Sequence, residues 1–123
     1  MQFTFPQDDK YFSWTAHIKN KMLYYGLSES RIRRVLKSPT RTEEGIAPET
    51  IAVMQSSTTR KTPEEIWVMY QDKREKKKAK NLVSAFTNRK FLMISAWRYP
   101  GTTKPGASIP IPDDILDELE RLA

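Results

Sequence analysis

The sequence predicts an α+β domain in which a pair of short helices packs on a small antiparallel sheet. Between residues 15 and 37 apolar side chains recur at about 3.6 residues, the period of a helix, whereas strand-like patterns dominate between residues 50 and 99. Helices that precede a meander of antiparallel strands are typical of α+β domains. We therefore expect residues 1–101 to form this domain and residues 102–123 to form a Pro/Gly-rich linker and a C-terminal helix.

The first helix is expected over residues 15–25, after a short edge strand at residues 2–6 and an extended piece at residues 11–14. Ser13 or Thr15 can supply the N-cap oxygen. Two stripes run along the helix, an apolar one of Ile18, Met22 and Tyr25 and a polar one of His17, Lys21 and Tyr24. Gly26 is well placed to end the helix in the left-handed conformation.

A second helix should begin at Ser28, a good N-cap, and end at Ser38 and Pro39. Its apolar face consists of Ile32, Val35 and Leu36. Three arginines, Arg31, Arg33 and Arg34, cover the rest together with Lys37. Because they cannot all lie on one helical face, some of them are expected only to solvate the helix.

Three strands are expected at residues 50–55, 65–71 and 90–99, with the last two paired. The last strand is the longest. Strict alternation places Phe91, Met93, Ser95, Trp97 and Tyr99 on one side and Leu92, Ile94, Ala96 and Arg98 on the other. Its second half brings polar and aromatic groups to the strand end, where a site would be held rigidly; the alternative is a core strand whose end simply reaches solvent.

Between the paired strands, residues 72–89 are predicted to form a long, basic, mobile loop; a helix through residues 74–86 is the alternative. Six of the eight residues from Lys73 to Lys80 are Lys or Arg. After residue 101 an extended segment leads to a short amphipathic helix that starts at Pro112. One face of this helix carries Ile115, Leu119 and Leu122, which should pack back on the domain.

Composition narrows the range of functions. There is no cysteine and a single histidine, which excludes thiolate chemistry and multi-histidine metal sites, so we expect no metal or cofactor. No apolar run has the length of a membrane span and no signal-peptide core is present, so a cytoplasmic protein is expected. Residues 1–104 carry 20 Lys and Arg against 10 Asp and Glu, and this basic body favours a polyanionic partner.

The first helix and the turn after it resemble a branch of the RelE/ParE-type toxin superfamily. That branch has the pattern T-x-H-A-x-x-R-M, followed by Gly, a hydrophobic residue and Ser. The matching residues are Thr15, His17, Ile18, Lys21, Met22, Gly26, Leu27 and Ser28, with Ile18 in place of the usual Ala and Lys21 in place of Arg. The resemblance implies the fold shared with barnase-like ribonucleases, RNA or the ribosome as partner, and a cognate antitoxin. Active members cleave RNA, while others target gyrase or have no known activity, so an endoribonuclease and a non-enzymatic interaction module both stay open.

RNA cleavage by the 2′-hydroxyl needs a proton acceptor, a group that stabilises the charge on phosphorus and a proton donor. The candidate catalytic residues are His17, Arg98, Tyr99 and Lys21. The candidate nucleic-acid-binding residues are Trp97, Ser95, Arg31, Arg34, Lys73, Arg74, Lys76, Lys77, Lys78 and Lys80. The structural alternatives are a helix-start histidine bonded to a carbonyl, an ion-paired Arg98 and a Tyr99 packed at the rim of the core.

Overall fold

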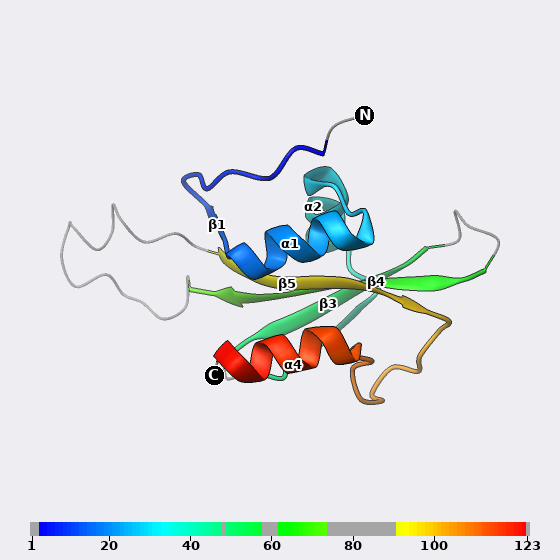
Figure 1. The fold of residues 1–123 in the computed structure, drawn as a ribbon. Coiled ribbons are helices and arrows are strands. Elements are labelled where there is room, and N and C mark those ends of the chain that lie inside the picture. The colour runs from blue at the N-terminus through cyan, green and yellow to red at the C-terminus, as the bar shows by residue number, and fades with distance from the viewer. Residues whose placement is uncertain (1–2, 48, 58–61, 74–90, 123) are drawn as a thin grey trace.

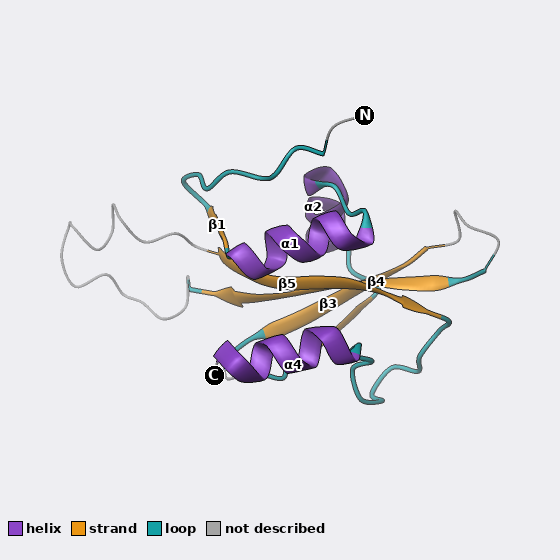
Figure 2. Ribbon diagram, viewed as in Figure 1, coloured by secondary structure: helices purple, strands orange, loops and turns teal. Residues whose placement is uncertain are grey.

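The computed structural model of this protein describes residues 3–47, 49–57, 62–73 and 91–122. This part of the chain forms three helices and an open mixed sheet of five strands, which confirms the α+β class (Figures 1 and 2). The elements, in chain order, are β1 (Phe12–Trp14), α1 (Ala16–Tyr25), α2 (Glu29–Lys37), β2 (Arg41–Glu44), β3 (Ile51–Ser57), β4 (Glu64–Asp72), β5 (Phe91–Pro100) and α4 (Asp113–Leu122). Residues 74–89 of the predicted basic loop lie outside the described residues, and β4 extends one residue into the predicted start of that loop, to Asp72.

The strands follow the order β1-β5-β4-β3-β2. β3, β4 and β5 form the predicted antiparallel meander, and the predicted pairing of the last two strands is confirmed, with Trp67 opposite Trp97. The expectation of a purely antiparallel sheet is wrong at one edge, because β1 pairs in parallel with β5 through Phe12 and Phe91. A three-residue strand is too short to show an alternating pattern, so the sequence carried no sign of this pairing.

Two further differences from the prediction concern short strands. β2 was not predicted, because its sequence is polar; it pairs with β3 and buries only Arg41. The strand expected at residues 2–6 is absent from residues 3–6, the part of it that the structure describes. Edge strands need one buried face at most, so their apolar pattern is weak.

The helix ends follow the predicted capping chemistry. Thr15 Oγ1 accepts a hydrogen bond from the Ile18 amide, and Ser28 Oγ accepts one from the Arg31 amide. Gly26 ends α1 with φ of 69°, a conformation that favours glycine. The same Thr15 hydroxyl donates to Ile94 O at 2.9 Å and so anchors the start of α1 beside β5.

Each face of the sheet carries its own core, with α1 and α2 on one side and α4 on the other (Figure 1). Ile18, Met22, Ile32 and Val35 fill the first core. In the second core the rings of Trp67 and Trp97 stack at 6.3 Å under Ile115 and Leu119. Ile115 and Leu119 therefore pack back on the domain as predicted.

A bulge changes which face β5 presents. Met69 is opposite Ser95, but the next residue, Tyr70, is opposite Met93, so Ile94 is an extra residue in the ladder. Met93 consequently packs in the α1–α2 core, whereas Trp97 packs in the α4 core. Strict alternation, which placed Met93 and Trp97 on one side, was therefore wrong across the bulge.

The segment between β5 and α4 is fastened to the sheet by buried charges. Glu65 is 1% exposed and accepts hydrogen bonds from the Thr103 amide at 2.7 Å and from the Trp67 indole at 3.1 Å. Arg41 donates to Thr103 Oγ1 and, at 2.6 Å, to Ala107 O. These bonds set the path of the chain into α4.

Candidate functional site

A cluster of polar side chains joins α1, β5 and α4. His17 Nε2 lies 2.8 Å from Ser95 Oγ, and His17 Nδ1 lies 3.3 Å from Glu118 Oε1. Lys21, one turn along α1, places its Nζ 2.9 Å from a carboxylate oxygen of both Asp114 and Glu118. Two predicted catalytic residues and the predicted nucleic-acid-binding Ser95 therefore meet in one place.

Tyr25, rather than the predicted Tyr24, is the third member of the polar stripe on α1. Its hydroxyl donates to Asp114 at 3.2 Å, whereas Tyr24 is 74% exposed. Helical spacing alone favours Tyr24, but the long Tyr25 side chain turns toward the carboxylate on α4. Burial is the larger cause that raises the pKa of Tyr25, and the bond to Asp114 raises it further.

The electrostatics of this cluster favour charged acids and a neutral histidine. Burial lowers the pKa of His17, and the Lys21 charge adds to this, although Glu118 opposes it. Burial also works to lower the pKa of Lys21, but its hydrogen bonds to Glu118 and Asp114 outweigh that effect and raise it. The pKa of Glu118 is lowered, chiefly by the Lys21 hydrogen bond. The pKa of Asp114 is lowered too, because its bonds to Lys21 and Tyr25 outweigh burial.

α4 covers this cluster. The side chains of His17 and Lys21 are only 8% and 11% exposed, and Ser95 is fully buried. The two carboxylates occupy the positions from which a phosphate would contact Lys21. The arrangement is closed, with an imidazole and an ammonium group covered by a helix.

Arg98 is a structural residue in this arrangement. It donates from Nε to Tyr25 O at 2.6 Å and from Nη2 to Gly26 O at 3.2 Å, and it forms an ion pair with Glu64. These bonds satisfy carbonyls at the C-terminus of α1. The guanidinium is therefore not free to reach a substrate, and the structural alternative, an ion-paired Arg98, is the one observed. Arg98 lies at the opposite end of α1 from His17, about 12 Å along the helix, so the two cannot act on one phosphate.

The predicted aromatic residues of β5 are also engaged in packing. Trp97 is fully buried and its indole donates to Pro110 O at 2.8 Å, so naming it as a nucleic-acid-binding residue was wrong. Tyr99 is half-buried against the α4 core, on the other face of the sheet from Arg98. Both rings are held by the segment that leads into α4.

A second candidate site is a groove of 390 Å³ between α2 and β3. Its lining consists of Arg31, Arg34, Ser38, Thr40, Gln55, Ser56 and Ser57. Gln55 positions the first arginine: it accepts from Arg31 Nη1 and donates from Nε2 to Ser38 O at 2.8 Å. Arg33 points elsewhere, toward Glu29 at 2.7 Å, so the three arginines do not share a face, as predicted.

Burial lowers the pKa of Arg31, and the neighbouring charges of Arg34 and Arg98 lower it further, against the opposing effect of Glu64. Within the described part of the chain, neither Arg31 nor Arg34 forms an ion pair. Of the candidate basic residues in the predicted loop, Lys73 is described and is exposed; Arg74, Lys76, Lys77, Lys78 and Lys80 lie outside the described residues.

Sequence reasoning missed Asp114, Glu118, Tyr25 and Gln55. One signal was present: His17 and Lys21 are four residues apart, and so are Asp114 and Glu118. Two helices with matching i, i+4 rows of opposite charge can pair along their lengths. The location of Gln55 carried no such signal.

Comparison with protein-family models, curated proteins and solved structures gave no match. No helix in the described part of the chain is long and apolar enough to cross a membrane. Among the described residues, no three His, Asp or Glu side chains gather as they would around a metal ion.

Proposed function

We propose that this protein is an RNA-binding domain of the RelE-like type, which holds the RNA backbone in the groove between α2 and β3. One observation carries the proposal. Arg31 and Arg34 line this groove together, and within the described part of the chain neither guanidinium has an ion-pair partner. A bound phosphate would relieve the repulsion between the guanidinium groups.

The groove has the chemistry that phosphate contacts use. Guanidinium forks match the oxygens of a phosphate, and side-chain hydroxyls complete the hydrogen bonding. Arg31 is held by Gln55, which lowers the entropy cost of binding, and the exposed residues Ser38, Thr40 and Ser56 line the same groove. Such contacts position a backbone but read no sequence. An acidic surface of a protein is the alternative partner.

Cleavage of the bound RNA is a second candidate function, favoured by the 2.8 Å contact between His17 and Ser95 beside Lys21. A neutral His17 would take the proton of a 2′-hydroxyl as its oxygen bonds to phosphorus. Lys21 would stabilise the charge on the phosphate while the bond to the 5′-oxygen breaks and that oxygen takes a proton from water. This chemistry requires α4 to move off the cluster.

The experiment is fluorescence anisotropy with a labelled single-stranded RNA over a series of salt concentrations. Arg31→Gln combined with Arg34→Gln should weaken binding about tenfold or more and reduce the slope against salt by up to two, one unit for each phosphate contact. The matched control is Lys104→Gln, an exposed cation in the segment before α4. Equal affinity of the double variant and wild type would overturn the groove assignment, and binding of an acidic protein but not RNA would favour the interaction module.

A further inference from the structure

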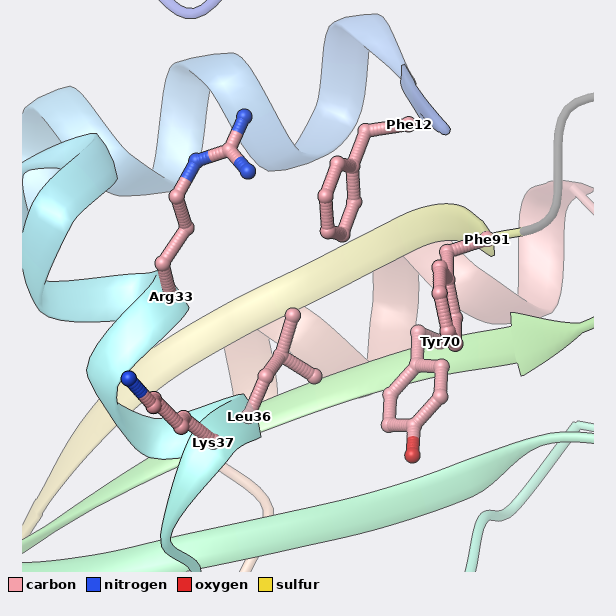
Figure 3. A pocket seen from close by; sticks show the side chains of 6 residues that line it. All are labelled: Phe12, Arg33, Leu36, Lys37, Tyr70 and Phe91. Carbon is pink, nitrogen blue, oxygen red and sulfur yellow. The ribbon is translucent and has the colours of Figure 1, made fainter. Parts of the chain in front are cut away.

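An aromatic pocket lies on the other side of α2 from the groove between α2 and β3. It has a volume of 360 Å³ and is lined by Phe12, Arg33, Leu36, Lys37, Tyr70 and Phe91 (Figure 3). Pockets that take small ligands begin at about 300 Å³. Four elements contribute, β1, α2, β4 and β5, so the walls are held by the sheet and by a helix rather than by a loop.

Three rings from three strands make one continuous wall of this pocket. Phe12 and Phe91 are opposite one another in the parallel pair of β1 and β5, and their rings stack at 5.3 Å with an angle of 22°. Tyr70 meets Phe91 edge-on at 5.9 Å. All three side chains are half-buried, so each keeps some ring surface accessible. A planar aromatic ligand would gain stacking contacts here that an aliphatic one would not.

The α2 side of the pocket is cationic. The Arg33 guanidinium faces the Phe12 ring (Figure 3) and lies 4.3 Å from its centre. Glu29 and Asp9 pair with this guanidinium. Its charge is thus largely compensated, and its flat group serves as a wall. Lys37 is exposed and has no ion-pair partner in the described part of the chain. It is the cation that an incoming anion would meet.

We propose that this pocket binds one unpaired nucleobase of an RNA strand, with the adjoining phosphate on Lys37. The proposal rests on the proposed function. It adds that the RNA is single-stranded, because a base can enter a pocket only when it is unstacked and unpaired. Rings beside a cation match a base beside its phosphate. α2 separates the two sites, with Arg33 and Lys37 facing the pocket and Arg31 and Arg34 facing the groove.

The first test titrates the full chain with uridine monophosphate and follows the ring resonances of Phe12, Tyr70 and Phe91 by NMR. All three should shift together and saturably. Lys37→Gln should weaken binding of the nucleotide several-fold but leave binding of uridine, which has no phosphate, unchanged. If the amide of N-acetyltyrosine shifts the rings as strongly as the nucleotide does, the pocket takes aromatic peptide side chains and the proposal is overturned.

The second test compares single-stranded RNA with inorganic polyphosphate, an anion that has no bases. Tyr70→Leu should weaken binding of RNA about tenfold, the scale of one lost stack, and leave polyphosphate binding unchanged. Tyr24→Leu, which removes the highly exposed ring on α1, is the matched control. Unchanged RNA binding by Tyr70→Leu together with unmoved ring resonances would overturn the pocket and leave the groove intact. Ring shifts with the nucleotide, but no binding of RNA or polyphosphate, would instead overturn the proposed function and with it the RNA strand as occupant, and leave a pocket that binds mononucleotides.

Discussion

Lys21 Nζ lies 2.9 Å from Asp114 Oδ2, although the two residues are 93 positions apart in the chain. This contact joins α1 to α4 across the edge of β5. Glu118 lies equally close to Lys21, so a single cation holds two carboxylates of the C-terminal helix. The apolar residues Ile115 and Leu119 dock α4, and Lys21 fixes how it lies against α1.

Replacing Lys21 with Met should destabilise the protein by about 1–2 kcal/mol, the scale of lost hydrogen bonds to charged groups. Methionine keeps most of the side-chain volume but leaves Asp114 and Glu118 without the cation between them. Urea unfolding should report the lower stability. Lys19→Met is the control on the same helix. Equal stability of Lys21→Met and wild type would show that the α4 carboxylates are adequately solvated without Lys21.

Acid should loosen the attachment of α4 in two stages. The pKa of His17 is lowered in the folded protein, so just below the ordinary histidine pKa of 6.5 the unfolded chain binds more protons than the folded one. In this range the stability of the fold therefore decreases as the pH is lowered. The pKa values of Asp114 and Glu118 are lowered from 3.8 and 4.5. Their contribution is complete above these values and is lost as pH falls through the folded values.

Thermal unfolding followed as a function of pH would measure both stages. His17→Gln, whose amide can still reach Ser95, should remove the stage near pH 6.5 and keep the more acidic one. The groups that face His17 are Ser95, Glu118, Lys21 and Asp114, and among them only the carboxylates titrate in the acidic range. A His17→Gln variant with the same profile as wild type would place the first stage elsewhere.

Arg98→Ala should cost stability rather than act on chemistry. The change removes two hydrogen bonds to carbonyls at the end of α1 and the ion pair with Glu64, a residue that is 8% exposed. We expect a loss of about 2–3 kcal/mol, measured by urea unfolding. Arg98→Lys, which keeps the charge but not the fork, should recover only part of it. Full stability of Arg98→Ala would contradict the capping role.

The sequence was most informative where local chemistry decides the structure. The caps at Thr15 and Ser28 and the end of α1 at Gly26 were predicted because each depends on one residue and its near neighbours. The bulge at Ile94 depends on how two strands register along their whole length, and a period of two cannot reveal it.

The candidate site was only partly predictable for the same reason. His17, Lys21 and Arg98 were named from their chemical types, which are suited to a site and equally to an ion pair. Arg98 proved to be bound to the carbonyls of Tyr25 and Gly26. These two residues are so far from Arg98 in the sequence that no local pattern connects them. The position of α4 over His17 likewise follows from tertiary packing.

The last prediction concerns cleavage. Asp114→Asn combined with Glu118→Gln should release Lys21 and His17 without removing Ile115 or Leu119, which dock α4. Because these acids stand where a phosphate would contact Lys21, cleavage of a labelled RNA should appear or rise about tenfold or more. Adding His17→Gln to the same variant should abolish the gain, since no proton acceptor then remains beside Lys21.

The matched control is Asp113→Asn combined with Asp117→Asn. Both residues are exposed on α4, and the change in net charge is the same. A gain in that control as well would mean that lower overall negative charge improves RNA binding in general. If neither variant cleaves RNA while both bind it, His17 and Lys21 serve to hold α4 in place, and the protein binds RNA without cutting it.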